Sequence, residues 1–163
     1  MRFKPILLVA ALSASIGIGR ADEFKRPPTK EGLWETLSTQ IQQVKTVSHV
    51  SAKMCQSKDS AESMRVSGEE LRKKNGCTST VTRPSPNTYI EESRCAKGPS
   101  AGSVTKVVYT HQGDTASRTE MHMTLGNSPT VMIMDAKYVG SCPAGVKPGD
   151  LIMSDGKVIS GSN

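Results

Sequence analysis

The chain has 163 residues, with 21 Lys and Arg against 15 Asp and Glu, and only 4% of its residues are aromatic. This length suits one domain, and so few aromatic side chains predict a modest core. The formal charge of +6 is typical of nucleic-acid or acidic-lipid binders, but part of it lies in an N-terminal targeting segment, so the sequence requires neither partner.

Residues 1–21 form a predicted signal peptide. Arg2 and Lys4 supply a positive start, and residues 5–18 are uncharged and mostly apolar, a run too short to span a membrane. Cleavage leaves 18 basic against 15 acidic residues, a net charge of +3. We therefore expect export to the periplasm or beyond the cell, with no transmembrane segment in the mature protein and no nucleic-acid partner.

A flexible leader and a β domain are expected next. Residues 22–31 are charged and contain two adjacent prolines, which favours a flexible leader. The domain is predicted over residues 32–142. It opens with a strand over Gly32–Thr39, and the alternation of residues Thr46–Met54 predicts a second strand.

The period changes between Cys55 and Cys77, which predicts a short helical excursion. A helical turn is expected over 58–64. Ser67-x-x-Glu70 reads as a capping box that starts a further turn, and Asn75-Gly76 is a stop signal.

After Cys77 the chain returns to strands, at 78–82, 88–96 and 104–110. The next loop, at Gln112-Gly113-Asp114, has two or three residues. This choice stays open, and it decides whether Val104 and Val108, or instead Val107 and Tyr109, face the core.

A hairpin rich in methionine is predicted over Thr115–Tyr138. If Gly126–Pro129 form a four-residue loop, Met123 faces Met132 and Met121 faces Met134. Alternation then places the four methionines on one face and most charged side chains on the other. We expect the methionines to form one buried block.

The tail over 143–163 is predicted to be irregular, with a small hairpin on a type I′ turn at Asp155-Gly156. The predicted fold is therefore mainly β. We expect a curved antiparallel meander sheet or a partly open barrel, with one short helical excursion.

Four cysteines behind a signal peptide indicate two disulfides, for which three pairings exist. No Cys-x-x-Cys spacing occurs, which disfavours zinc ribbons and thioredoxin-type redox sites. We predict Cys55–Cys77, because it closes the helical excursion. Cys95–Cys142 then ties a middle strand to the end of the last one.

Several short motifs together carry a family resemblance. They are Gly32-Leu33-Trp34-Glu35, the order of the four cysteines, the segment Tyr138–Pro143 and the segment Lys147–Asp150. In this order, over about residues 31–150, the chain resembles a secreted proteobacterial family designated domain of unknown function 3617. The resemblance implies a cell-envelope protein with an antiparallel β domain, and it supplies no catalytic residues.

Three functional hypotheses follow. The first is a non-catalytic binding module for a small ligand or an envelope protein, with Trp34 as a core plug or as the lining of a ligand cavity. The second is a copper-binding protein, because thioethers are soft ligands for Cu(I) and Met121, Met123, Met132 and Met134 share one face. The third is a hydrolase without a recognisable motif. We expect no cofactor, and His111, beside a turn, is expected to be exposed.

Overall fold

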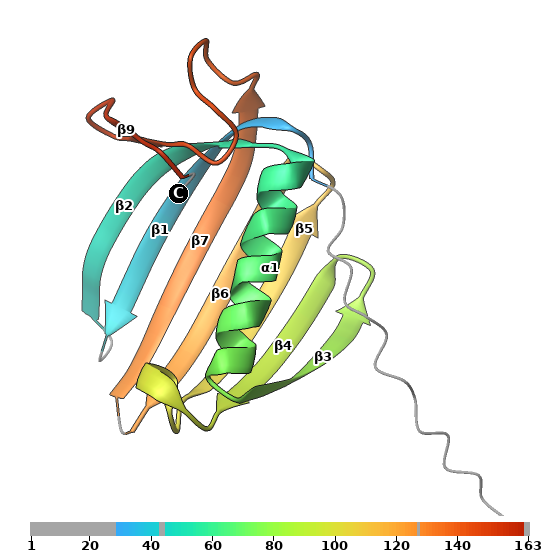
Figure 1. Ribbon diagram of the computed structural model, residues 1–163, viewed down its shortest axis with the longest axis vertical. Helices are drawn as coiled ribbons and strands as arrows, with labels where there is room; N and C mark the ends of the chain where they lie inside the picture. Colours follow the sequence, from blue (N-terminus) through green and yellow to red (C-terminus); the bar gives the residue numbers. More distant parts are fainter. Residues whose placement is uncertain (1–28, 43–44, 127, 162–163) are drawn as a thin grey trace, which may run out of the picture.

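The computed structural model describes residues 29–42, 45–126 and 128–161. The predicted signal peptide and the leader as far as residue 28 lie outside the described residues. The described chain forms one antiparallel sheet that does not close, and a single helix lies across it (Figure 1). This confirms the mainly β fold.

The sheet has nine strands in the order β3-β4-β5-β6-β7-β1-β2-β8-β9. β3 to β7 follow one another as a meander, and β7 then pairs with β1. The strand bounds are β1 Gly32–Gln42, β2 Lys45–Gln56, β3 Cys77–Ser85, β4 Thr88–Cys95, β5 Val104–Gln112, β6 Ala116–Leu125, β7 Ser128–Gly140, β8 Leu151–Met153 and β9 Val158–Ile159. A short 3-10 turn, η1 (Gly98–Ser100), precedes β5.

The helix α1 is one continuous element, Lys58–Lys74, and not two short turns. Its N-cap is Ser57, whose hydroxyl accepts from the Ser60 backbone N–H, and the Ser60 hydroxyl in turn accepts from the Ser57 N–H. The capping box predicted at Ser67 is therefore wrong, because the earlier box already satisfies the first turn and Ser67 lies inside the helix. The predicted stop is confirmed, with Asn75 as the C-cap.

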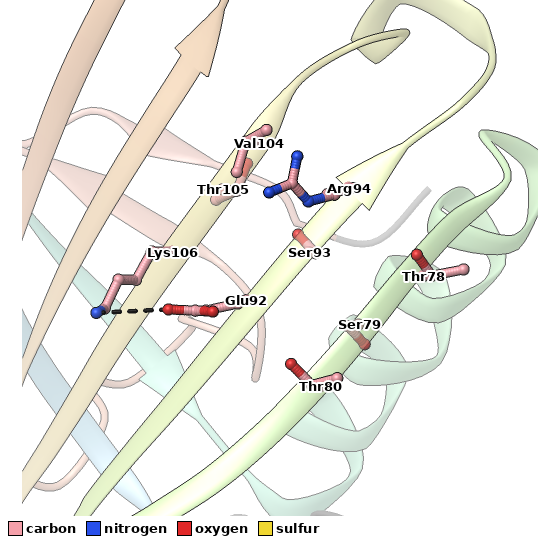
Figure 2. A pocket seen from close by; sticks show the side chains of 9 residues that line it. All are labelled: Thr78, Ser79, Thr80, Glu92, Ser93, Arg94, Val104, Thr105 and Lys106. Atoms are coloured by element: carbon pink, nitrogen blue, oxygen red, sulfur yellow. Dashed lines mark ion pairs between the residues drawn. The ribbon is translucent and has the colours of Figure 1, made fainter.

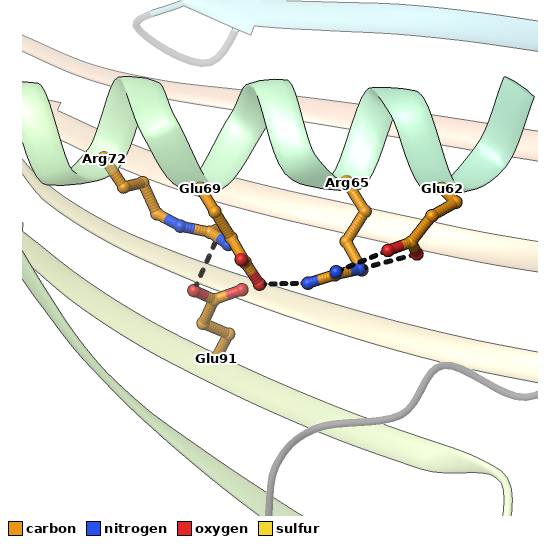
Figure 3. A network of polar contacts seen from close by, with 5 residues as sticks. All are labelled: Glu62, Arg65, Glu69, Arg72 and Glu91. Atoms are coloured by element: carbon orange, nitrogen blue, oxygen red, sulfur yellow. Dashed lines mark hydrogen bonds and ion pairs between the residues drawn. The ribbon is translucent and has the colours of Figure 1, made fainter.

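One face of the sheet, here called the inner face, is turned towards α1. Arg72 of the helix lies 3.4 Å from a carboxylate oxygen of Glu91 on β4, an ion pair drawn in Figure 3. Because side chains alternate along strands, the inner face follows from the pairing register. Its larger apolar side chains are Trp34, Val50, Met54, Val81, Tyr89, Val107, Tyr109, Met121, Met123, Met132, Met134 and Tyr138.

The methionine hairpin differs from the prediction by two residues. Leu125 pairs with Ser128, so Met121 lies opposite Met132 and Met123 lies opposite Thr130. A shift of two residues keeps every side chain on its predicted face. Burial is nevertheless incomplete, because Met123 is 38% exposed, and the expected buried block is only partly realised.

The preceding loop has three residues, since Gln112 pairs with Ala116. This settles the open alternative. Val107 lies opposite Met121, and Tyr109 lies opposite Thr119, both on the inner face.

Both predicted disulfide pairings are wrong. The disulfides join Cys55 to Cys142 and Cys77 to Cys95, with Cα–Cα distances of 5.5 and 3.9 Å. Cys77 and Cys95 are direct cross-strand neighbours on β3 and β4. Cys142 follows the end of β7. Leu33 at the start of β1 pairs with Gly140 on one side and with Cys55 on the other, so the end of β7 lies close to the end of β2.

The tail forms the predicted small hairpin, and the hairpin extends the main sheet. The predicted two-residue turn at Asp155-Gly156 is wrong, because the Gly156 N–H donates to the Met153 carbonyl at 2.9 Å and the central residues of the turn are therefore Ser154 and Asp155. β8 pairs with β2, and β9 pairs with β8. The carboxylate of Asp150, a buried residue, accepts from the Lys147 N–H at 2.9 Å, and the Cys55 N–H donates to the Asp150 carbonyl at 3.1 Å. These contacts tie the tail to the end of β2.

Candidate functional site

The inner face is an apolar floor with small side chains in its middle. One row of register partners crosses β2, β1, β7 and β6 as Ala52, Thr36, Ala136 and Ser117. The methionines and Val107 lie on one side of this row, and Trp34 and Tyr138 lie on the other.

The end of the floor near the start of α1 is closed by aromatic packing. Trp34 is 3% exposed, and its Nε1–H donates to the Lys30 carbonyl at 2.8 Å. Its ring meets Tyr138 edge to face at 6.1 Å between centroids, and the Lys30 ammonium lies 4.4 Å from the centre of the Tyr138 ring. Trp34 therefore packs as a plug and also borders the floor.

A second aromatic cluster lies on the same face, on β4 and β5. His111 meets Tyr109 and Tyr89 edge to face, at 4.3 and 6.0 Å between ring centroids. His111 is only 5% exposed, so the expectation that it is exposed is wrong. The sequence places His111 beside a turn. Its side chain points inwards because the following loop has three residues, a length that the sequence did not determine.

The margins of the floor are accessible to solvent, and its middle is half-buried. Val50 and Val81 on the inner face are 44% and 38% exposed. The helix contributes no buried residue, and its Met64 and Leu71 are 48% and 58% exposed. A sheet face usually buries its apolar side chains against a second layer, so this floor is only partly covered by α1.

Charged side chains, not apolar ones, link α1 to the floor (Figure 3). Arg65 bonds to both Glu62 and Glu69, and Arg72 pairs with Glu91. The hydrogen bond from Arg65 lowers the pKa of Glu62, and its two glutamates raise the pKa of Arg65. Arg72 and Glu91 thus hold the last turns of the helix over the β4 side of the floor.

The methionines proposed as copper ligands do share the floor. Met121 and Met132 are direct partners, while Met123 and Met134 lie diagonally from them. His122 points to the opposite, outer face, where its Nε2 lies 3.9 Å from Glu120. Within the described ranges, no three His, Cys, Asp or Glu side chains are grouped to hold a metal ion.

The outer face carries a ladder of ion pairs. Glu35 pairs with Lys137 at 2.8 Å, and Arg118 pairs with Asp135 at 2.9 Å. The hydrogen bond and the charge of Lys137 lower the pKa of Glu35, and both ion pairs border a shallow depression of about 550 Å³. Its mixed charges are paired across strands, which is typical of a solvated sheet face.

One contact between a hydroxyl and an imidazole, on the outer face, is relevant to the hydrolase hypothesis. His49 Nδ1 lies 3.1 Å from the Thr39 hydroxyl, and this contact is exposed to solvent. The contact joins a cross-strand pair of β1 and β2. It has the character of a surface hydrogen bond.

Comparisons with known proteins give one result. Searches of curated proteins and of solved structures found no match. No helix among the described residues is long and apolar enough to cross a membrane. The sequence matches the family described as "Protein of unknown function (DUF3617)" over residues 29–142, which spans β1 to β7 and both disulfides. The chain therefore belongs to this DUF3617 family.

Proposed function

We propose that this protein is a non-catalytic binding module that holds an elongated apolar small molecule on the inner face, beneath α1. The observation that carries the proposal is the exposed apolar floor. Met123 and Val50 remain 38% and 44% exposed, although a 17-residue helix crosses the same face. Ligand sites are mostly apolar concavities with a few polar groups, and this floor has that composition.

The two ends of the floor differ in a way that suits one elongated ligand. Trp34 and His111, at 3% and 5% exposure, close the end near the start of α1. Met123 lies towards the other end, the same end of the sheet at which the Cys77–Cys95 disulfide lies on β3 and β4. An alkyl chain entering beside Met123 would meet flexible thioethers first and the small row at Ala136 next.

The polar groups above the floor suit a ligand with a polar end. Arg72 and Glu91 are 42% and 24% exposed and lie between the helix and the sheet. A ligand head group here would find one cation and one carboxylate within hydrogen-bond reach. The proposal needs no chemical step.

The proposed compartment is the bacterial periplasm or the exterior of the cell. Two disulfides are compatible with an oxidising compartment. The signal peptide predicted at residues 1–21 also favours export from the cytoplasm. Apolar small molecules need a protein carrier in such aqueous spaces, because exposing their surface to water is unfavourable.

A dye-binding experiment tests the proposal. The apolar dye N-phenyl-1-naphthylamine should fluoresce saturably with the purified protein, and stearate should displace it. Ala136→Leu fills the small row and should weaken dye binding about tenfold. Val139→Leu also ends in leucine but adds only one methylene, on the exposed outer face of β7, and should leave binding unchanged.

The dye result has clear contrary outcomes. A linear, unsaturable signal would contradict a site. Equal affinities for the two leucine variants, both melting like the wild type, would place any binding away from the inner face.

Copper binding is the second candidate, favoured by the direct Met121–Met132 pair on the floor. Anaerobic Cu(I) should then raise the melting temperature of the wild type and fail to do so for Met121→Leu with Met132→Leu. Leucine keeps the apolar surface, so the dye should still bind to this double variant. The copper candidate therefore predicts that the double variant loses its response to Cu(I), whereas the small-molecule candidate predicts that the double variant still binds the dye.

A further inference from the structure

The strand β3 forms one long edge of the sheet. It pairs with β4 on one side, and among the described residues no strand lies on its other side. From Thr78 to Ser85 every residue is exposed. Figure 1 shows β3 at the outer limit of the sheet. Edge strands present backbone groups to which another strand can bind.

The alternation of hydrogen-bonded and non-hydrogen-bonded residue pairs between β3 and β4 identifies which backbone groups of β3 face outwards. Cys77 and Cys95 are direct partners with a Cα–Cα distance of 3.9 Å, which is typical of the closely spaced, non-hydrogen-bonded pairs of antiparallel ladders. Hydrogen-bonded and non-hydrogen-bonded pairs alternate. Ser79 and Val81 therefore direct their N–H and C=O groups away from β4, towards the open edge.

Over residues 78–82 this edge lacks the usual protection against strand pairing, and a charge and a proline follow only at the far end of β3, at Arg83 and Pro84. Residues 78–82 read Thr-Ser-Thr-Val-Thr, with no charge, no proline and high β propensity. At the other end of the sheet, β8 and β9 are short, and the exposed strand β2 begins with Lys45. Short strands and edge lysines both discourage pairing.

The β3 edge is also held rigid at both ends. The Cys77–Cys95 disulfide closes one end of the β3–β4 hairpin. At the other end, the Arg83 guanidinium donates to the Pro86 carbonyl at 2.8 Å and lies 5.1 Å from the Tyr89 ring. A preorganised edge loses little conformational freedom when a strand is added.

A depression of about 410 Å³ lies on the outer face beside this edge (Figure 2). It extends from the hydroxyls of Thr78 and Thr80 to β5. Lys106 pairs with Glu92 at 3.4 Å across its floor, and Arg94 makes no ion pair with the described residues. The depression therefore carries one uncompensated positive charge.

We propose that β3 is a strand-addition site for an extended, acidic segment of a partner protein. The segment pairs its backbone with Ser79 and Val81. Its alternate side chains face the outer depression, where a carboxylate meets Arg94 and hydroxyl or β-branched side chains lie beside Thr78 and Thr80. A second copy of this chain fits less well, because it brings the same uncompensated cation to the same edge.

Peptide titration tests this proposal on the purified protein. The probe is an end-capped octapeptide of alternating valine and glutamate, compared with one of alternating valine and lysine. The glutamate peptide should bind saturably and at least about tenfold more tightly than the lysine peptide. Arg94→Gln should reduce this preference several-fold.

Backbone pairing is tested at Val81. Val81→Pro removes an N–H that points to solvent and breaks no bond to β4, so the protein should fold and peptide affinity should fall at least about tenfold. Val81→Thr is the matched control, and it should bind like the wild type. In hydrogen exchange, the peptide should protect the amides of Ser79 and Val81 in the wild type.

Other outcomes overturn the proposal. These are unchanged affinity in a folded Val81→Pro variant, no protection at Ser79 and Val81, or equal binding of the two peptides. Sedimentation that finds a wild-type dimer, converted to a monomer by Val81→Pro, would assign the edge to a second copy instead. Peptide protection in the wild type keeps the test decisive if the proline variant fails to fold.

Discussion

Removing each disulfide separately should destabilise the protein by different amounts. The Cys55–Cys142 bridge joins residues 87 apart, and the Cys77–Cys95 bridge joins residues 18 apart. Loop-closure entropy then gives about 4.6 kcal/mol for the first and about 3.2 kcal/mol for the second. Cys55 is also 1% exposed, so its loss removes packing as well. The double alanine variant of the long bridge should therefore be the less stable.

Urea unfolding of the two double alanine variants measures these free energies. The expected difference is at least about 1.4 kcal/mol in the free energy of unfolding, of which loop closure supplies about 1.4 kcal/mol, with similar dependence on urea. Equal stabilities, or a larger loss for the Cys77–Cys95 variant, would refute the loop-closure argument. Non-reducing peptide mapping checks the pairing itself, and a linked Cys55–Cys77 peptide would contradict the structure.

Three further predictions concern single side chains. Trp34→Ala should lower the free energy of unfolding by about 3–5 kcal/mol, because the ring is buried. A loss below about 1 kcal/mol, measured by thermal unfolding, would contradict its role as a plug. Asp150→Ala leaves the Lys147 N–H without its acceptor and should lower the free energy of unfolding by about 1–3 kcal/mol. Hydrogen exchange of the Lys147 amide should become faster, and unchanged exchange would argue against this hydrogen bond. The lowered pKa of Glu35 contributes stability above its usual value of 4.5, and this contribution is lost as the pH falls through the lowered value. Glu35→Gln should flatten the acid side of the melting curve against pH, and an unchanged slope would be the contrary result.

The faces of the methionine hairpin could be predicted from the sequence, but its register could not. Alternation alone separates Met121 and Met132 from Arg118 and Asp135. Turn composition allowed a longer loop than the one that forms. A shift of two residues preserves the alternation, so the pattern carries no information to distinguish the two registers.

The disulfides could not be predicted, because their pairing depends on strand order. The spacing between Cys55 and Cys77 suggested a bridge across the helical excursion. Instead β1 lies between β7 and β2, and this long-range pairing brings Cys142 beside Cys55. The helix α1 also spans the sheet, which carries Cys77 away from Cys55.

The candidate floor was only partly predictable. Trp34 and the methionines were identified from the sequence, and the structure brings them to one face. His111 was missed, because its direction follows from a three-residue loop that the sequence left open. The exposure of the floor depends on how α1 lies over it, with charged side chains towards β4, and no periodicity reveals that arrangement.

Quenching of Trp34 by a brominated fatty acid tests the central claim most directly. Trp34 is the only tryptophan in the chain and borders the closed end of the floor, so its fluorescence reports a ligand at that place. Stearate brominated near its methyl end should quench it saturably, and stearate should reverse the effect. Ala136→Leu should weaken the quenching, while Val139→Leu should not. Unchanged Trp34 emission, or equal quenching in both variants, would contradict a ligand on the inner face.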